Sequence, residues 1–533
     1  MRCSKYTKLF GLLSIIVFIM VMFSGYAKMS HAESKITSHA AAGEPRMTHY
    51  TSMFNPYEMP EEIGEVIYIA GTWYEMGYQY GLQGGSIIAR DYVDRSQSLI
   101  PKIFVSQKAL LAQSEKYLEN LKERSADLYD LVSGIANGAG LGLRETAIGT
   151  VFNWSNFERN ACMSISAWGE ATPGGKVIAG VNGDGSWSGG KCYFPAVVAY
   201  PKKGNAFMSN RGFFANCFVN EKGLVSMTQF VPTPDIAYGL AAMITGLEVS
   251  YRCSTAKEAL DLYINGGIAP GSGENFHCID AHGNAFVVEH TANHNSVRYP
   301  GDFGEKNYLI ANNHVLTDEM SPLCVPVFPN CWPRYWTSEK VLQDNFGKIT
   351  LGTIHSALAS KTYYNKKDGE WSKNDWIIGS GLTPEVHAKK SKTHSRGLID
   401  ITSLTLYRQN GGTDTLNNFC PHTTGNLSKI TMGKDVAATN TNAMNDAYDM
   451  IYLAGKDIAL SQEAVSSERI DYLNKAKEAL VAGISLTSLA AYAASIGDEA
   501  QSIVYYSRAS SEFCLSQRFA QSAQDNPVYY CGY

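Results

Sequence analysis

A cysteine in the interior of the chain, Cys162, is the residue whose surroundings carry the most chemical information. It follows Arg159, Asn160 and Ala161 and opens a stretch of small and apolar residues. If the chain is cut between Ala161 and Cys162, the cysteine gains a free α-amino group beside its thiol. An α-amine has a pKa of about 8, so a usable fraction is neutral near pH 7 and can take the proton from the thiol. One residue would then hold both a nucleophile and its base.

The number of cysteines leaves a second interpretation open. The chain has 11 cysteines, and Cys3 falls in the N-terminal segment. In an exported protein the default role of a cysteine is a disulfide, and an even number remains. On this second interpretation all of them pair, the chain stays uncut, and the protein is an extracellular binding module that uses its helical tail. The cysteines concerned are Cys162, Cys192, Cys217, Cys253, Cys278, Cys324, Cys331, Cys420, Cys514 and Cys531.

The N-terminal residues are typical of an export signal. A basic start with Arg2, Lys5 and Lys8 precedes an apolar run over residues 9–22, and small residues follow. We expect a signal peptide over residues 1–32 and a secreted or extracytoplasmic protein, with an uncleaved anchor as the alternative. No other apolar run approaches membrane length, so we expect no stable membrane span after signal removal.

The pattern of the remaining chain predicts an α+β fold, with sheets covered by helices. Residues 65–71 form a strand candidate, and residues 71–81 lead into a helix. Leucines at helical spacing over residues 106–135 predict one long helix that ends at the glycines of residues 137–140. From about 162 to 320 short strands dominate, with helices near 240–249 and 255–264, and from about 439 the pattern is helical. We divide the chain into a propeptide or small subunit at 33–161, a catalytic core at 162–438 and a helical extension at 439–533.

Charge and motifs exclude several functional classes. The net charge is −5 with a pI near 6.2, and no basic stripe is present, so we expect no nucleic-acid partner. The sequence has no H-E-x-x-H motif and no paired C-x-x-C motif, so we expect no metal and no cofactor.

Several blocks in order give the chain a resemblance to a known family. The blocks are G-T-W-Y-E-M-G-Y-Q-Y-G at 71–81, V-S-G-I-A-N-G-A-G-L at 132–141, the stretch 162–184, N-E-K-G-L at 220–224, N-F-H-C-I-D at 275–280 with Gly283 and Glu289, N-N-H at 312–314, and F-C-P-H at 419–422. With these blocks the chain resembles the acyl-CoA:6-aminopenicillanic-acid acyltransferase family, peptidase family C45, of the N-terminal nucleophile hydrolases. The resemblance covers roughly residues 65–435 and does not explain the helical tail.

The resemblance implies a four-layer αββα sandwich and a set of site residues. Cys162 is the nucleophile, freed by self-cleavage of the Ala161–Cys162 bond. Asp184 orients the α-amine or the thiol, and Asn313 helps to hold the oxyanion, where one donor can be worth about 3 kcal/mol. Both also have ordinary interpretations, because Asp184 is a typical turn residue and Asn313 could simply close a strand.

Further residues are less firmly placed by the same resemblance. Arg334 lies where related enzymes carry an active-site arginine, although a surface arginine would fit equally well. Gln229 follows the N-E-x-G-L turn and is a candidate oxyanion donor. His314 and His422 are expected to pack or to contact substrate, because the mechanism needs no separate base.

Two departures from the family pattern have consequences. Val181 stands where the family has an arginine before N-x-D, so a substrate carboxylate contact from that residue is absent. Ala161 stands where glycine is frequent, which bears on the rate of self-cleavage.

Together these patterns predict a hydrolase that is made as a proenzyme. Its partners are a small-molecule acyl amide as substrate and its own N-terminal fragment, held by the apolar face from Leu110 to Val132. Cys162 would form a thioester with the acyl group, which then passes to water or to a second amine. Hydrolysis is favoured over transfer because coenzyme A thioesters are not expected outside the cytoplasm. A phospholipase-B-like lipid hydrolase is the alternative within the same superfamily.

Overall fold

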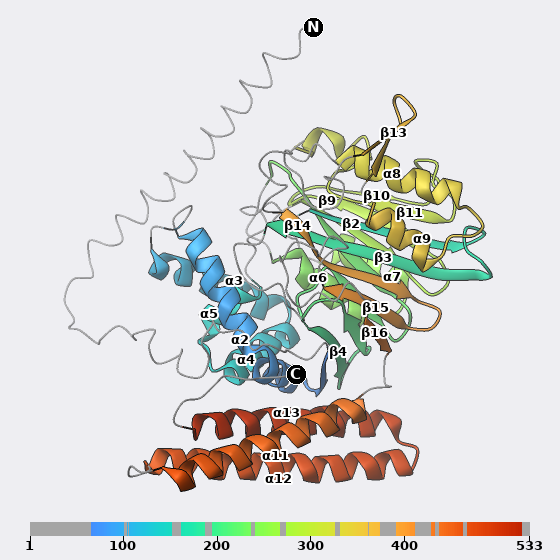
Figure 1. Ribbon diagram of the computed structural model, residues 1–533. Coiled ribbons are helices and arrows are strands. Elements are labelled where there is room, and N and C mark those ends of the chain that lie inside the picture. The colour runs from blue at the N-terminus through green and yellow to red at the C-terminus, as the bar shows by residue number, and fades with distance from the viewer. Residues whose placement is uncertain are drawn as a thin grey trace, which may run out of the picture. The chain divides into compact units, whose positions relative to one another are not determined.

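The described residues all belong to the second of two compact units, Met1–His49 and Tyr50–Tyr533. The computed structural model describes residues 66–100, 104, 106–151, 161–186, 195–235, 240–266, 273–325, 331–360, 362–373, 391–410, 428–431, 436–461 and 466–524 (Figure 1). The predicted signal peptide and the segment just before Ala161 lie outside these ranges.

Two large sheets and a small hairpin form the β-structure of the described residues. The sheets have eight and six strands. Only the β1–β4 pair is parallel among the strand pairs described. In spatial order the first sheet is β1 (Val66–Gly71), β4 (Ala196–Pro201), β5 (Phe207–Ser209), β6 (Cys217–Asn220), β7 (Val225–Val231), β8 (Gly273–Ile279), β9 (Ala285–His290) and β10 (Asn295–Arg298). The second is β11 (Tyr308–Ala311), β2 (Ala161–Gly169), β3 (Gly175–Ser186), β14 (Ser391–Asp400), β15 (Thr405–Asn410) and β16 (Ser428–Thr431), and the hairpin is β12 (Thr362–Asn365) with β13 (Glu370–Lys373).

The helices follow the strands in three groups. The first group is α2 (Trp73–Leu99), α3 (Gln107–Arg124), α4 (Ala126–Ala139) and α5 (Leu143–Gly149). The second is α6 (Ala242–Arg252), α7 (Ala256–Asn265), the 3-10 helix η3 (Ser321–Leu323), α8 (Cys331–Asp344) and α9 (Leu351–Leu358). The third is α11 (Val436–Leu460), α12 (Ser467–Ser495) and α13 (Glu499–Ser522).

The two sheets share one buried apolar cluster. Val181 of β3 and Leu309 of β11 come from the second sheet, and Val198 of β4 and Met227 of β7 come from the first. Alternation along each strand turns these side chains to one face, so the sheets meet through their inner faces.

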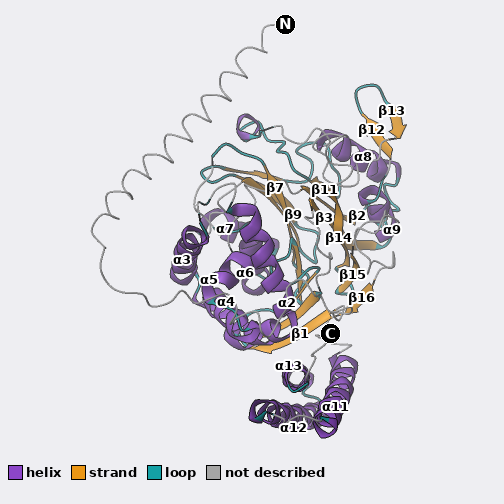
Figure 2. Cartoon of the chain, turned by 60° about the vertical axis from the view of Figure 1, so that its left-hand side comes forward, coloured by secondary structure: helices purple, strands orange, loops and turns teal. Residues whose placement is uncertain are grey.

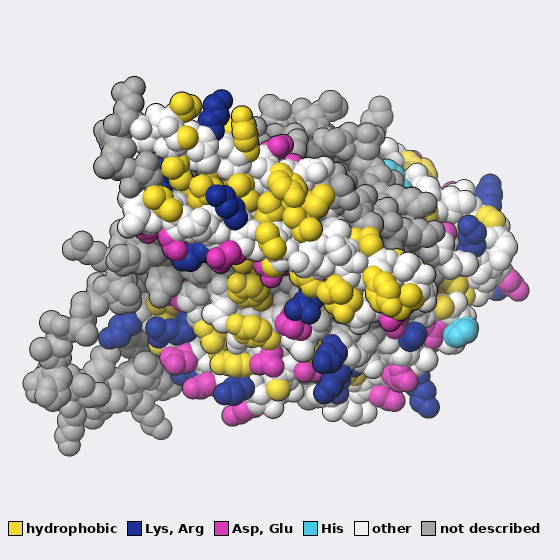
Figure 3. Space-filling model, turned by 90° about the horizontal axis from the view of Figure 1, so that it is seen from below, with side chains coloured by type: hydrophobic (Ala, Val, Ile, Leu, Met, Phe, Trp, Pro, Cys, Tyr) yellow, Lys and Arg dark blue, Asp and Glu magenta, His cyan; other side chains and the backbone are white. Residues whose placement is uncertain are grey.

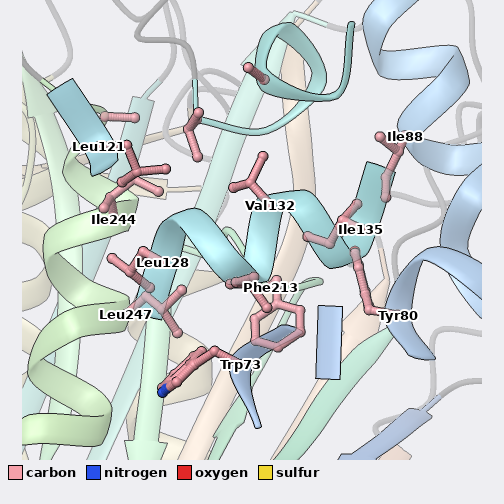
Figure 4. Packing of buried hydrophobic residues seen from close by; sticks show 14 of the residues in the cluster. Trp73, Tyr80, Ile88, Leu121, Leu128, Val132, Ile135, Phe213, Ile244 and Leu247 are labelled. Atoms are coloured by element: carbon pink, nitrogen blue, oxygen red, sulfur yellow. The ribbon is translucent and has the colours of Figure 1, made fainter. Parts of the chain in front are cut away.

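Separate clusters bury the outer faces under helices. Trp73, Leu131 and Phe213 belong to the cluster that packs α2–α6 against β1, β4, β5 and β6 (Figure 4). On the other sheet, Ile165 and Ile354 belong to the cluster that packs α8 and α9 against β2, β3, β11 and β14. Figure 2 shows α2–α7 on one side of the strands and α8 and α9 on the other. The α+β class is confirmed.

Most predicted elements of the first half of the chain are present, with one correction. The strand at 65–71, the helix after it and the helices near 240–249 and 255–264 are confirmed as β1, α2, α6 and α7. The single helix expected over 106–135 is wrong. Ser125 interrupts it: its backbone N–H bonds Leu121 as the end of α3, and its hydroxyl accepts the N–H of Leu128 as the cap of α4. Serine is a strong N-cap residue, so one apolar stripe is divided between two helices.

The helical extension packs on the rest of the unit through its last helix. In α13 the Arg518 guanidinium donates to the carbonyls of Gly138 and Gly81, and the Cys514 thiol donates to that of Leu82. The expected boundary at 438/439 falls inside α11, which begins at Val436.

The outer helices of the extension expose apolar side chains. Tyr452 of α11 and Tyr492 of α12 are more than half exposed, and Figure 3 shows hydrophobic patches in the view from below Figure 1. The sequence analysis found no other apolar run near membrane length. In the described part of the chain, however, one helix, α12, is long and apolar enough to cross a membrane, by length and composition alone. Leu480 of α12 nevertheless packs against Phe513 of α13.

The described cysteines are all free thiols, which contradicts the pairing of all ten. They are Cys162, Cys217, Cys253, Cys278, Cys324, Cys331 and Cys514. The remaining Cys192, Cys420 and Cys531 lie outside the described residues.

Candidate active site

The candidate nucleophile sits near the start of an interior strand. Strand β2 lies between β11 and β3, and Cys162 is its second residue, opposite Gly183. Met163 and Ile165 face the cluster under α8 and α9. Because side chains alternate along a strand, Cys162, Ser164 and Ser166 face the opposite sheet.

Three of the other four predicted catalytic residues, Asp184, Asn313 and Arg334, lie together around Cys162. The Cys162 backbone N–H donates to Asn313 Oδ1 at 3.0 Å, and Arg334 Nη1 donates to the Cys162 carbonyl at 3.0 Å. Arg334 Nη2 also donates to Asn313 Oδ1 at 2.6 Å. Asp184 Oδ2 is 3.7 Å from Arg334 Nη1. Asn313 and Arg334 therefore fix both the nitrogen and the carbonyl of the candidate nucleophile.

Asp184 is a fully buried carboxylate at the end of β3. Its Oδ1 accepts a hydrogen bond from the Thr393 hydroxyl of β14 at 2.6 Å. Burial raises the pKa of Asp184, and Arg334 and Thr393 act in the opposite direction. The ordinary interpretation of Asp184 as a turn residue is wrong, because Asp184 lies within strand β3 and is 1% exposed.

The thiol of the uncut chain is held in its neutral form. Burial and the nearby Asp184 carboxylate raise the pKa of the Cys162 thiol to about 12, although a hydrogen bond from the Asp184 backbone acts in the opposite direction. The Cys162 nitrogen belongs to a peptide bond here, so it cannot accept a proton. In the intact chain the Cys162 thiol is therefore protonated at neutral pH.

The fifth predicted residue, Gln229, is fully buried on β7 and its amide is unused. Neither Gln229 Oε1 nor Nε2 has a hydrogen-bond partner among the described residues. The next residue, Phe230, accepts a hydrogen bond through its carbonyl from Asn313 Nδ2 at 2.6 Å. A buried amide without a partner is costly, so Gln229 is a candidate to bind a group that the described residues do not supply.

Strand β8 and helix α8 hold the loop that carries Asn313. Asn275 Nδ2 donates to the carbonyls of Asn312 and His314, each at 2.8 Å, on either side of Asn313. Asn312 Nδ2 donates to the Cys331 carbonyl at 2.7 Å, at the first residue of α8. One turn later α8 presents Arg334. These bonds set Asn313 and Arg334 relative to each other.

A buried charge cluster supports the same two segments. Arg298 pairs with Glu305 at 2.9 Å and with Glu289 at 3.4 Å, and all three are at most 2% exposed. Glu289 accepts the backbone N–H of Thr317, beyond the Asn313 loop, and Glu305 accepts the hydroxyl of Tyr335, next to Arg334.

For His314 and Val181 no contact with the Cys162 side chain is described. His314 is buried, its ring is bonded to Asn312 and packs on Trp332, and burial lowers its pKa to about 3. Val181 is buried in the cluster between the sheets. His422 lies outside the described residues. Within the described ranges no group of His, Cys, Asp and Glu side chains is arranged to hold a metal ion.

Sequence reasoning missed the supporting residues Thr393, Asn275 and His277. For the last two a signal was present, since Asn275 and His277 alternate on one face of a predicted strand. Nothing near Thr393 in the sequence ties it to Asp184, which is 209 residues away.

A comparison with models of known families finds a match to this chain. Residues 211–367 match the model of the family described as acyl-coenzyme A:6-aminopenicillanic acid acyl-transferase. This range contains Gln229, Asn313 and Arg334 and does not contain Cys162 or Asp184. No protein among those with curated descriptions matches the chain.

Several solved structures are similar to the chain at low sequence identity. A mutant of conjugated bile acid hydrolase from Clostridium perfringens is 14% identical, with 51% of this chain and 92% of that chain covered and a TM-score of 0.35. Penicillin V acylase from Agrobacterium tumefaciens is 14% identical, with 48% and 77% covered and a TM-score of 0.28. At these low TM-scores the likeness carries no argument by itself. The match of the family model confirms the resemblance of this chain, over residues 211–367, to the acyl-coenzyme A:6-aminopenicillanic acid acyl-transferase family.

Proposed function

We propose that this protein is a cysteine N-terminal nucleophile hydrolase, which cuts its own Ala161–Cys162 bond and then hydrolyses small-molecule acyl amides. The observation that carries the proposal is the pair of bonds by which Asn313 and Arg334 hold the nitrogen and carbonyl of Cys162. An ordinary structural cysteine in a strand would bond only to the neighbouring strands. Here two side chains from distant segments are aimed at its backbone.

Self-cleavage turns the backbone nitrogen of Cys162 into a base. The Cys162 thiolate adds to the Ala161 carbonyl carbon, the bond from that carbon to the Cys162 nitrogen breaks, and the nitrogen takes a proton. Water then hydrolyses the thioester, which leaves the Ala161 carboxylate and a free Cys162. The new α-amine remains within reach of Asn313 Oδ1, which accepts from the same nitrogen before the cut.

Turnover uses the same atoms. The α-amine takes the thiol proton, the sulfur attacks the amide carbonyl carbon of the substrate, and the leaving amine departs with that proton. Water hydrolyses the thioester with the α-amine again as base. The buried Asp184 carboxylate favours the cationic amine that forms at each attack.

The oxyanion of both steps needs donors that are not already engaged. In this structure Asn313 Nδ2 already donates one hydrogen bond to the Phe230 carbonyl. Gln229, the residue before Phe230, is fully buried, and its amide has no hydrogen-bond partner in the part of the chain that the structure describes. We therefore assign the main side-chain donor to Gln229, with the second N–H of Asn313 in support.

The finer features of the fold and the life cycle belong to the same proposal. The shared cluster between the sheets and the helices on both outer faces support a four-layer αββα sandwich. Strand β1 and helices α2–α5, which precede Cys162, share a buried apolar cluster with β4, β5, β6 and α6, which follow it. This shared cluster supports an N-terminal fragment that stays bound after the cut. The basic and apolar residues 1–22 support export.

Self-cleavage is expected to accelerate with pH. The pKa of the uncut Cys162 thiol is raised to about 12, so the thiolate fraction grows about tenfold per pH unit between pH 6 and 9. The measurement is the rate at which freshly translated chain is cut in buffers across that range. A rate that is flat or falls with rising pH would contradict a thiolate step, and Cys217→Ala, at a buried cysteine outside the site, should leave the curve unchanged.

An acyl-enzyme on Cys162 is expected during turnover of an N-acyl amino acid. After a quench in acid, mass mapping of peptides should find the acyl group on Cys162, and hydroxylamine should remove it because a thioester is labile to this nucleophile. Hydrolysis of the amide with the acyl group on another residue would overturn the assignment. Faster turnover of a lysophospholipid than of every acyl amide tested would favour the lipid hydrolase instead.

A further inference from the structure

A buried histidine connects the nucleophile strand to the opposite sheet. His277 of β8 is bonded through Nδ1 to the Ser164 hydroxyl and through Nε2 to the Ser166 hydroxyl, each at 2.8 Å. All three residues are fully buried. Ser164 and Ser166 follow Cys162 on the same face of β2. His277 therefore binds this strand two and four residues after the candidate nucleophile.

This polar contact lies between the same two sheets as the buried apolar cluster. The inner faces of the sheets meet through side chains such as Val181 and Met227, which specify no unique offset between the strands. An imidazole ring with both nitrogens hydrogen-bonded does specify the offset between β2 and β8, because both hydrogen bonds are lost if β2 shifts along or away from β8. Hydrogen bonds supply the direction that apolar packing lacks.

Strand β8, which carries His277, also holds the loop that contains Asn313. Two residues before His277, Asn275 bonds the carbonyls on either side of Asn313. Since Asn275 and His277 alternate with Phe276, both face β2. Strand β8 thus contacts the nucleophile segment and the Asn313 segment through neighbouring side chains.

The histidine cannot serve as a proton carrier at ordinary pH. Burial and the nearby Arg298 charge together lower the pKa of His277 to about 3, so the ring is neutral at ordinary pH. A neutral ring has one donor and one acceptor nitrogen, and the two serine hydroxyls can satisfy both, because a hydroxyl can accept or donate.

We propose that His277 is a positioning residue, which acts through Ser164 and Ser166 to fix Cys162 at the correct depth opposite Asn313 and Arg334. The inference rests on the proposed function of Cys162 as nucleophile. It adds a residue with no part in the chemistry but with control over the geometry of the attack. Displacement of a reacting atom by about 1 Å can cost about a hundredfold in rate.

The test compares graded variants with a matched control. Ser164→Ala removes the bond nearer to Cys162, Ser166→Ala removes the farther one, and His277→Phe keeps a ring while it removes both. His290→Phe is the control, because His290 is also a buried histidine of the same sheet, packs on Phe276 and makes no described contact with β2. Each full-length protein is assayed for self-cleavage, kcat and KM on an N-acyl amino acid, melting temperature, and alkylation of Cys162 by iodoacetamide.

The expected result is an order of effects on rate. We expect kcat and the cleavage rate to fall about tenfold in Ser164→Ala, less in Ser166→Ala and up to about a hundredfold in His277→Phe, with KM changed less than twofold to threefold. The shape of the pH profile should stay the same, and His290→Phe should keep the rates of the wild type.

Alkylation separates this inference from the proposed function, because it needs no turnover. We expect Cys162 in Ser164→Ala to alkylate at a rate different from the wild type by severalfold, while His290→Phe does not differ. If Ser164→Ala lowers the melting temperature but leaves kcat and alkylation unchanged, His277 is structural only and the inference is overturned. If the alkylation rate changes while Cys162→Ala retains activity, the positioning role stands and the proposed function fails.

Discussion

Replacement of Cys162 by alanine is expected to leave the chain as one uncut polypeptide and to abolish amide hydrolysis. The substitution removes the only atom that both proposed steps use as nucleophile. Loss of the nucleophile in comparable catalytic units costs about a millionfold in kcat. Gel electrophoresis of the purified protein and release of the amine from an N-acyl amino acid measure the two effects.

A matched cysteine variant controls for the loss of a thiol. Cys217 is free, buried and packed between the sheets without a bond to the site. Cys217→Ala should reduce stability through a small cavity and leave cleavage and hydrolysis intact. Cleavage of the Cys162→Ala chain at the same bond, or turnover by it, would refute the proposed nucleophile.

Replacement of Gln229 by methionine is expected to reduce activity while stability is retained or increased. Loss of one oxyanion donor costs about a hundredfold to a thousandfold in kcat. The Gln229 amide has no partner among the described residues, so its removal also removes a buried unsatisfied group, which is worth about 1–3 kcal/mol in the free energy of unfolding. Steady-state kinetics and thermal denaturation give the two numbers from one preparation.

The same substitution at Gln79 is the control. The Gln79 amide accepts the N–H of Ala70 at 2.9 Å and donates to its carbonyl at 2.7 Å. Gln79→Met should therefore destabilise the fold and leave kcat unchanged, the reverse of Gln229→Met. If Gln229→Met lost stability and kept its kcat, the amide would be a structural group and not a donor to the oxyanion.

The sequence allowed the local elements to be predicted where one signal dominated. Strand β1 was predicted from a β-branched run, and the helix expected after it is α2, which begins with a capping box formed by Thr72 and Glu75. The break at Ser125 was missed, because the apolar spacing continues across it while only the serine hydroxyl marks the cap. Periodicity reports the buried face of a segment and not the number of helices that supply it.

The site was predictable only in part, since its contacts join distant segments. Cys162, Asp184, Asn313 and Arg334 were predicted from motifs, and the structure places them within one hydrogen-bonded group. The hydrogen bond between His277 and Ser164 joins residues 113 positions apart, and it depends on which strands face each other across the two sheets. Such pairing is a property of the assembled layers, and no local pattern encodes it.

The most direct test of the proposed activation is the intact mass of the purified protein, together with the N-terminal sequence of its fragments. We predict two fragments that stay associated, one of which begins at Cys162 and ends at Tyr533. A single chain that spans the Ala161–Cys162 bond in a preparation that hydrolyses acyl amides would contradict the account, because the α-amine that serves as its base would not exist.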